Sequence, residues 1–218
     1  MIQYIIEGGP MMLVLMACSI VSLAVNIDKI RAFRANSKID IRSLRAQIIT
    51  LLGEDRVTDA MTLCANTPGP VSAVMLVGLQ SYHRLLAAQP TPEVIRTLLG
   101  KSMEDYSAQA LNAVENRLNV LSTIGNTAPL FGMTGTVTGM IRSFSALAGA
   151  VSLEAGAVGA GIAEALINTA AGLIVALASV LPYNYYMNLV ERINLDIQEA
   201  SSEMVEFLTM RAEMRQPR

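Results

Sequence analysis

The stretch GIAEALINTAAGL, residues Gly161–Leu173, opens an apolar run that is long enough to cross a membrane. Its first half nevertheless carries a carboxylate at Glu164, an amide at Asn168 and a hydroxyl at Thr169. Glu164 and Asn168 are four residues apart, so they share one face of a helix. Ionisable groups at membrane depth are costly and usually face a protein interior or a wet path. The stretch therefore predicts a membrane helix whose polar residues meet another protein group or water.

The composition of the whole chain indicates a membrane protein. Of its 218 residues 52% are hydrophobic and 16% are charged, whereas soluble domains carry about 25% charged residues. Uncharged runs of 20, 24 and 26 residues are bracketed by Glu7 and Asp28, by Arg117 and Arg142, and by Glu164 and Glu191. About 20 apolar residues span the hydrocarbon core as a helix. We expect an all-α integral membrane protein with three transmembrane helices and long cytoplasmic helical extensions.

The basic residues predict the orientation of the chain. Of the 16 Lys and Arg residues, 11 lie between the first and second uncharged runs and four follow the third. Basic residues near membrane spans favour the cytoplasmic side. We therefore expect the N-terminus outside and the C-terminus inside. The expected segments are an outer tip with transmembrane helix 1 (1–27), a cytoplasmic helical region (28–117), transmembrane helix 2 (118–141), an outer loop (142–156), transmembrane helix 3 (157–182) and a cytoplasmic C-terminal helix (183–218).

The sequence of the expected cytoplasmic region, 28–117, predicts a series of helices. Apolar residues recur at three-to-four spacing from 41 to 52, Gly53 interrupts them, and Asp55 can start a second short helix. A turn at 67–70 precedes a largely buried helix over 71–86. Thr91-Pro92-Glu93 predicts a helix start, with a capping hydroxyl and proline in the first turn. No stop signal follows, so we expect one continuous helix into the second span.

The second span carries small residues on one face. Ala128, Gly132, Gly135 and Gly139 are spaced 4, 3 and 4 apart, a pattern that lets another helix approach closely. Pro129 cannot donate a backbone hydrogen bond, which predicts a local kink. By itself this face indicates helix packing.

Two motifs resemble one known family. Gly161-Ile162-Ala163-Glu164-Ala165-Leu166, with Thr169-Ala170, Gly172-Leu173 and Tyr183-Asn184, resembles the third span of the ExbB/TolQ/MotA proton-channel family. Ala128-Pro129-Leu130-Phe131-Gly132, with Gly135-Thr136-Val137 and Gly139-Met140, resembles its second span. Three spans with a large loop after the first are similar to the ExbB/TolQ branch.

The resemblance implies a subunit of a motor in the bacterial inner membrane, powered by proton motive force. Such subunits form a homopentamer around a single-span ExbD/TolR-like partner that bears a membrane aspartate. The pore-lining threonines of the family correspond to Thr136 and Thr169, and its glutamate corresponds to Glu164. Gly161 and Gly172 would join the helix-packing residues.

The third span departs from the family pattern in its prolines. Ala160 stands where a proline often precedes the glycine of the motif, and Pro182 lies one turn later than the usual proline. A kink at Pro182 should therefore move inward by about one turn.

Each polar residue also has a purely structural interpretation. A membrane threonine can bond the carbonyl of its own helix at i−4. We expect structural or gating roles for Glu164 and Asn168 rather than direct proton carriage by Glu164. The Glu164 carboxylate can interact favourably with the positive end of a helix dipole. Arg142 is suited to anchoring its helix at the membrane interface, or to an ion pair with Glu154 or with a partner protein. We expect His83 at the surface.

The sequence predicts neither a catalytic site nor a cofactor. Cys18 and Cys64 have no nearby ligand at metal spacing, no nucleophile has an orienting base, and no basic patch with interleaved aromatics suggests nucleic acid. A second hypothesis is a non-conducting scaffold that holds the partner in the membrane. Nutrient uptake, envelope maintenance and surface motility all fit the first hypothesis, and sodium could replace the proton.

Overall fold

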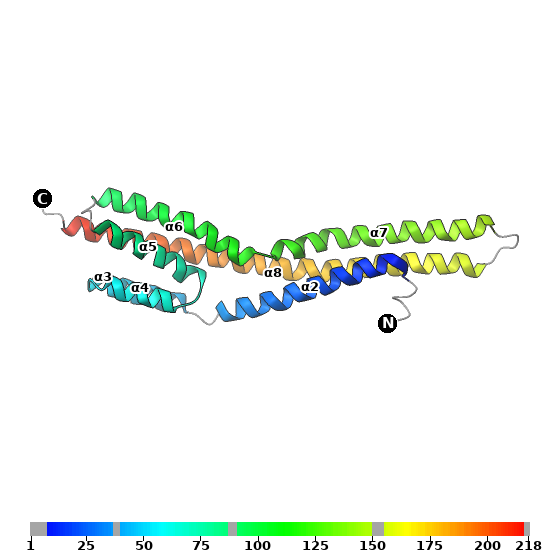
Figure 1. Cartoon of the computed structure of the whole chain (residues 1–218), viewed down its shortest axis with the longest axis horizontal. Helices are drawn as coiled ribbons and strands as arrows, with labels where there is room; N and C mark the ends of the chain where they lie inside the picture. Colours follow the sequence, from blue (N-terminus) through cyan, green and yellow to red (C-terminus); the bar gives the residue numbers. More distant parts are fainter. Residues whose placement is uncertain (1–7, 37–39, 87–90, 150–154, 216–218) are drawn as a thin grey trace. The chain divides into compact units, whose positions relative to one another are not determined.

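The computed structural model describes residues 8–36, 40–86, 91–149 and 155–215, and every regular element in these ranges is an α-helix. The helices are α2 (Gly9–Asn36), α3 (Ile41–Gly53), α4 (Val57–Asn66), α5 (Pro70–Leu86), α6 (Pro92–Glu115), α7 (Leu118–Gly149) and α8 (Ala155–Arg215). The predicted all-α class is confirmed for this part of the chain (Figure 1).

The chain divides into two compact units. The first unit comprises Met1–Ile30 and Arg117–Tyr186, and the second comprises Arg31–Asn116 and Met187–Arg218. Helix α8 is unbroken over its 61 residues and contributes to both units. The predicted helical continuation from residues 157–182 into the C-terminal region is therefore confirmed as far as Arg215.

In the first unit, α7 and the first half of α8 pack against one another, and α2 lies beside α8 (Figure 1). A small apolar cluster joins the three helices: Leu15, Ile124, Ala128, Val175 and Ala176. One polar contact accompanies it, because the Ser22 and Ser179 hydroxyl oxygens lie 2.8 Å apart in the buried α2–α8 contact. The Ser179 hydroxyl donates to the carbonyl of Val175 at 2.9 Å, so the Ser22 hydroxyl donates to Ser179.

The second unit has the larger apolar core. Helices α3 to α6 and the C-terminal half of α8 enclose it, and α8 contributes a stripe at three-to-four spacing: Ile193, Ile197, Ala200, Met204 and Leu208. The predicted burial of the helix over 71–86 is confirmed, since α5 buries Val71, Val74, Met75, Leu79 and Tyr82. Each fully buried side chain of this size stabilises the fold by roughly 1.5–3 kcal/mol.

An ion-pair cluster ties α3 to α8 at the edge of this core. Arg45 reaches Glu199 and Glu203 at 2.8 Å each, and only 15% of the Arg45 side chain is exposed. The hydrogen bond from Arg45, together with its charge, lowers the pKa of the Glu199 carboxyl. Arg211 makes a similar 2.9 Å contact with Asp55.

Side-chain capping accounts for some of the helix starts in the second unit, but not for all of them. The Asp40 carboxylate accepts the backbone N–H groups of Arg42 and Ser43, which caps α3. The predicted start of the next helix at Asp55 is wrong. Asp55 adopts a left-handed φ of 65° directly after α3, so the helical conformation resumes only at Val57. Helix α6 begins at Pro92 as predicted, but the Thr91 hydroxyl makes no capping hydrogen bond.

The expected continuous helix from 91 into the second span is wrong. Helix α6 ends at Glu115, Asn116 leaves the helical conformation, and Arg117 has a φ of 70°. No glycine or proline marks this break. Arg117 instead donates to the Asp28 carboxylate at 3.1 Å, a contact made across 89 residues.

The connection between α7 and α8 is shorter than the outer loop predicted at 142–156. Helix α7 continues to Gly149 and α8 begins at Ala155, while Glu154 lies outside the described residues. The extension of α7 is built from Ser, Ala, Leu and Phe, with no proline or glycine before Gly149 to stop a helix.

Two helices are long and apolar enough to cross a membrane, judged by length and composition among the described residues. They are Gly9–Arg34, with a mean hydropathy of 2.1, and Val158–Met214, with 1.9. Helix α7 is not among them, because its glycines, threonines and asparagines dilute its apolar residues. A membrane crossing by α7 stays a prediction.

Replacing Leu79 with Ala should weaken the second unit. Leu79 is fully buried, so its truncation leaves a cavity and should lower the free energy of unfolding by about 2–5 kcal/mol. Leu98→Ala is the matched control, because Leu98 is 45% exposed. Thermal unfolding in detergent measures both, and equal losses of stability would contradict the assignment of this core.

Cys64 should resist alkylation while the second unit is folded. Burial raises the pKa of the Cys64 thiol to about 11, and the thiolate is the reactive form. We expect slow reaction with iodoacetamide at about pH 8, and rapid reaction once denaturant exposes the thiol to its ordinary pKa. A Cys18→Ser background isolates the signal for mass spectrometry. Equal rates in the folded and denatured protein would contradict this burial.

Candidate functional site

The backbones of α7 and α8 approach one another closely along a row of small residues, which we call the α7–α8 seam. A Cβ added at Gly172 would lie 2.7 Å from the Ala128 carbonyl oxygen, and one added at Gly139 would lie 2.8 Å from the Gly161 carbonyl oxygen. Such distances leave no room for a side chain. The seam contains Ala128, Gly132, Gly135 and Gly139 on α7, and Gly161, Ala165, Asn168 and Gly172 on α8.

Asn168 lies at the middle of the seam and is fully buried. Its side chain rests on Gly135, where an added Cβ would come within 2.6–2.8 Å of three Asn168 atoms. Among the described residues, neither the amide oxygen nor the amide nitrogen of Asn168 has a hydrogen-bond partner. An unpartnered buried amide costs roughly 1–3 kcal/mol, so packing against Gly135 must offset it. Sequence periodicity put Asn168 on the face of Glu164 but did not show that it lacks a partner.

Thr136 and Thr169 each follow a seam residue, Gly135 and Asn168. Successive residues point about 100° apart around a helix. Because α7 and α8 are antiparallel and right-handed, the residue that follows a seam residue lies on the same edge of the contact in both helices. The short distance of 3.3 Å between the Thr169 Cα and the Cβ position of Gly132 agrees with this placement. The two threonines therefore lie on one edge of the seam.

The hydroxyls of Thr136 and Thr169 make hydrogen bonds of different lengths. Thr136 donates to the Met133 carbonyl at 2.6 Å, whereas the bond from Thr169 to the Ala165 carbonyl is 3.3 Å long. Both residues are half-buried. Each hydroxyl keeps acceptor capacity for water or another donor. Thr134 precedes Gly135, so the same geometry puts it on the opposite edge.

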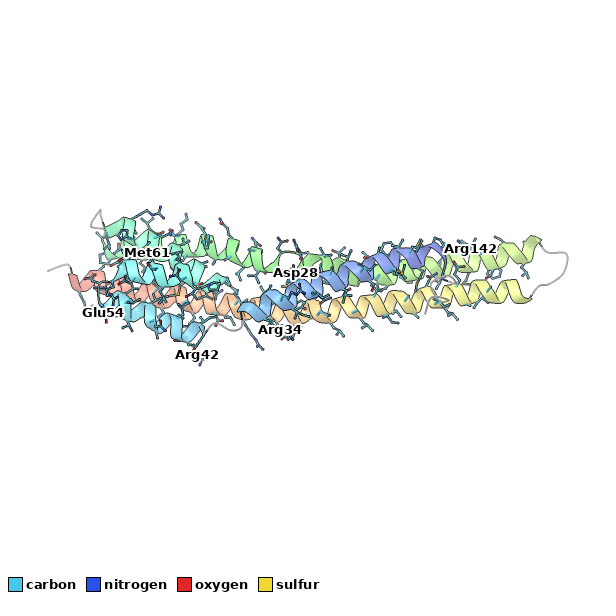
Figure 2. All side chains as sticks on the ribbon, turned by 60° about the horizontal axis from the view of Figure 1, so that its bottom comes forward. Asp28, Arg34, Arg42, Glu54, Met61 and Arg142 are labelled. Atoms are coloured by element: carbon cyan, nitrogen blue, oxygen red, sulfur yellow. The ribbon has the colours of Figure 1, made fainter. Side chains whose placement is uncertain are left out.

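An ion pair lies toward the end of the seam that is near the start of α8. Arg142 Nη1 is 2.7 Å from Glu164 Oε1, with 54% of the Arg142 side chain and 12% of the Glu164 side chain exposed. Figure 2 shows Arg142 on α7 and Asp28, whose partner is Arg117, on α2. The sequence offered Glu154 or a partner for Arg142. The structure pairs Arg142 with Glu164 of α8, while Glu154 lies outside the described residues.

The two predicted kinks lie within unbroken helices. Pro129 is inside α7 and Pro182 is inside α8. Each proline removes one backbone donor, which leaves the Gly125 and Ala178 carbonyls without that bond. The bend at each position stays a prediction.

One polar contact, between the C-terminal part of α2 and the middle of α8, was not expected from the sequence. Tyr186 donates to the Asn26 carbonyl at 3.3 Å, and the Asn26 amide nitrogen donates to the Ser22 carbonyl at 2.9 Å. The spacing of Ser22 and Asn26, four residues apart, was the available signal.

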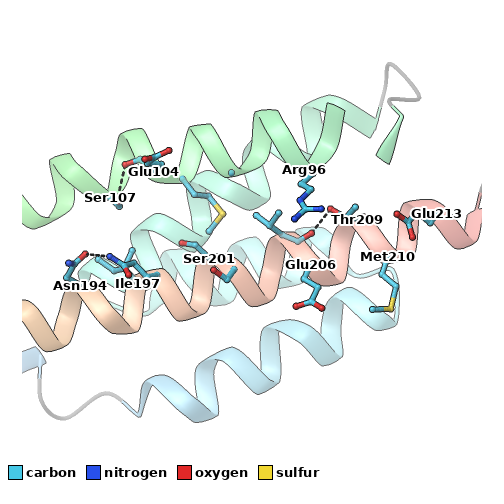
Figure 3. Close-up of a pocket in the computed structure, with 15 residues that line it drawn as sticks. Arg96, Glu104, Ser107, Asn194, Ile197, Ser201, Glu206, Thr209, Met210 and Glu213 are labelled. Carbon is cyan, nitrogen blue, oxygen red and sulfur yellow. Dashed lines mark hydrogen bonds between the residues drawn. The ribbon is translucent and has the colours of Figure 1, made fainter. Parts of the chain in front are cut away.

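The second unit carries a groove between α6 and α8, of about 1060 Å³ (Figure 3). Acidic residues come from both walls, with Glu104 on α6 and Glu206 and Glu213 on α8, and Arg96 lies among them. Gly100, Ser107, Ser201 and Ser202 make much of the lining small. Within the described ranges, no group of three His, Cys, Asp or Glu residues could hold a metal ion. His83 is exposed, as predicted.

Comparison with known proteins gives a consistent result. The model of the MotA/TolQ/ExbB proton channel family matches residues 66–199. The chain is 29% identical over 164 residues to a biopolymer transport protein ExbB of Pseudomonas putida, covering 75% of this chain and 50% of the relative. It is 30% identical over 138 residues to a Tol-Pal system protein TolQ of Haemophilus influenzae, covering 63% of this chain and 59% of the relative.

A biopolymer transport protein ExbB of Neisseria gonorrhoeae is 28% identical over 137 residues, which cover 59% of this chain and 60% of the relative. The chain thus spans about half to three fifths of the length of the curated relatives it matches. The family match includes α7, the whole seam and both threonines.

Replacing Gly172 with Ala should separate α7 from α8. The new methyl group would meet the Ala128 carbonyl and the Gly132 backbone, which cannot yield as a side chain can, so stability should fall by about 1–3 kcal/mol. Gly159→Ala is the control, because no atom of the described residues lies within 4 Å of its Cβ position. Thermal unfolding in detergent compares the two. Equal stability of both variants would count against the close contact.

Proposed function

We propose that this chain, which belongs to the MotA/TolQ/ExbB proton channel family, is a proton-channel subunit of a motor in the bacterial inner membrane. It would convert proton motive force into mechanical work through a single-span ExbD/TolR-like partner. The observation that carries the proposal is the family match over residues 66–199, because that range holds α7 and the part of α8 that we propose to cross the membrane.

The proposed topology has three spans, at 11–27, 118–141 and 157–182. The N-terminus lies on the periplasmic side and residues 28–117 and 183–218 lie in the cytoplasm. Two features support it: the basic residues cluster after the first span, and α2 and α8 are apolar enough to cross a membrane. The second unit would then stand in the cytoplasm, where its ion pairs and acidic groove meet water.

The proposed ion path runs along the edge of the seam that carries Thr136 and Thr169. A hydroxyl both donates and accepts, so the two residues can hold a chain of water molecules without a fixed charge. Their half-buried positions and the long 3.3 Å bond of Thr169 support this role. The proton-binding carboxylate would be an aspartate of the partner.

Five copies would surround the partner helices in the proposed assembly. Large apolar side chains on α7 and α8 are exposed in the single chain, as a subunit wall or a lipid-facing surface requires: Leu130, Met133, Val137, Ile141, Leu166, Leu173 and Leu177. Gly132 and Gly172 would serve packing within each copy rather than between copies.

A non-conducting scaffold is the second candidate. One observation favours it, since Glu164 is the only described carboxylate from 118 to 186 and it is already paired with Arg142. A scaffold would bind the partner but add nothing to proton flux. Flux in liposomes that requires both this chain and an aspartate-bearing partner would exclude it.

Thr169→Val should impair proton flux while the complex still assembles. Valine keeps the shape of threonine but removes a hydrogen-bonding group worth roughly 1.4 kcal/mol, so we expect about a tenfold loss of flux. Thr136→Val should act in the same direction. Thr134→Val is the matched control, because its hydroxyl bonds the Leu130 carbonyl and lies on the opposite edge of the seam.

The measurement is proton uptake by liposomes that contain this chain and its partner, normalised to the assembled complex. Undiminished flux in Thr169→Val, or an equal loss in Thr134→Val, would contradict the assigned path.

A further inference from the structure

The groove between α6 and α8, which we call the α6–α8 groove, lies wholly within the second unit. Its α6 wall runs from Arg96 to Ser107 and its α8 wall from Asn194 to Glu213 (Figure 3). At a rise of 1.5 Å per residue, the shorter wall is about 16 Å long, or roughly three turns of helix. With a volume of about 1060 Å³, the groove is large enough for a segment of polypeptide.

The lining of the groove suits a helix. Gly100 on α6, and Ser201 and Ser202 on α8, are small, so the backbone of a third helix can approach both walls. Met103 and Ile197 also line the groove, and both belong to the apolar core beneath it. Small walls over apolar side chains are what an amphipathic helix requires of a groove that binds it.

The charge of the lining indicates the sign of the ligand. Three carboxylates of the lining form no ion pair with the described residues: Glu104, Glu206 and Glu213. By contrast, Glu199 and Glu203 of the same α8 helix are both paired with Arg45 of α3. Arg96 is the one basic residue of the lining, so negative charge predominates and favours a basic ligand.

A single-span partner would bring the matching charge to the cytoplasm. In single-span membrane proteins, Lys and Arg residues gather next to the span on its cytoplasmic side. The second unit stands on that side in the proposed topology. The acidic groove and the partner's basic flanking segment are therefore complementary in charge and lie in the same compartment.

We propose that the α6–α8 groove binds the basic segment that adjoins the partner's span on the cytoplasmic side. The segment lies in the groove as a helix, with apolar side chains toward Met103 and Ile197 and basic side chains toward the three carboxylates. The inference rests on the proposed function and deepens it, because it adds a second contact outside the membrane. Two linked contacts hold a partner more tightly than either contact alone.

Site-specific cross-linking tests the occupant of the groove. The full-length chain carries the photoreactive amino acid p-benzoylphenylalanine in place of Ser202, an exposed residue of the lining, and is irradiated with its partner in liposomes. Mass spectrometry identifies the cross-linked peptide, which should come from the partner's segment next to its span on the cytoplasmic side. A product with a second copy of this chain, or with lipid only, would overturn the proposal.

Two further positions make the cross-link specific. The photoreactive residue at Gln47, which is exposed on α3 and does not line the groove, should give no product with the partner. If the Ser202 variant does not accumulate, Gln198 is the alternative position, because it is exposed and lines the groove. Equal yields at the groove position and at Gln47 would also overturn the proposal.

Charge variants test the complementarity. Glu104→Gln/Glu206→Gln should lower the yield of the cross-link at least about threefold, since each exposed charge contact changes an equilibrium constant by up to about fivefold. Asp105→Asn/Asp196→Asn is the matched control, because it removes two carboxylates from the same helices outside the lining and should leave the yield unchanged. Equal yields in the two double variants would contradict the charge match.

Proton flux through the same liposomes separates this inference from the proposed function. A complex that conducts protons but cross-links from the groove to another copy would overturn the inference and leave the proposed function standing. A chain that assembles with no single-span partner and conducts no protons would overturn both.

Discussion

The close approach of α7 and α8 is the contact on which the first unit depends. Backbone atoms of the two helices meet at Gly132, Gly139, Gly161 and Gly172. In a membrane, where lipid is as apolar as a leucine side chain, such contact draws on dispersion forces rather than on the hydrophobic effect. The small residues are thus necessary for attraction as well as for space. They also determine what lies beside them, with Asn168 enclosed and the two threonines on an edge.

The low dielectric around the first unit favours polar side chains that have a hydrogen-bond or ionic partner. The Ser22 and Ser179 hydroxyls bond one another, and Arg142 pairs with Glu164. Asn168 is the exception among the described residues of the seam, since its amide is buried without a partner. The threonine hydroxyls of α7 and α8 bond carbonyls of their own helix, as Thr136 does. In the proposed function this arrangement leaves a path that is polar but uncharged, so the proton-binding acid belongs to another chain.

The second unit depends on ordinary apolar burial, and it shares α8 with the first. Ile197, Met204 and Leu208 of α8 are almost fully buried among α3 to α6, while Val175 and Ala176 of the same helix belong to the apolar cluster with α2 and α7. One unbroken helix therefore enters two cores of different character. Residues 157–182 of this helix are mostly small and apolar, and its later part carries an amphipathic stripe.

The sequence by itself determined the helical class, the apolar spans, the small-residue faces and the family resemblance. These properties are local or periodic. They can be recognised within a few helical turns, as in Gly161–Leu173 and in the stripe from Ile193 to Leu208. Only the tertiary structure decided the break at Asn116 and Arg117, the pairing of Arg142 with Glu164, and the enclosure of Asn168. The physical reason is that a helical period identifies a face but leaves the register between helices open by whole turns of about 5.4 Å. Packing of the glycine backbones selects one register, and that selection brings residues far apart in sequence into contact.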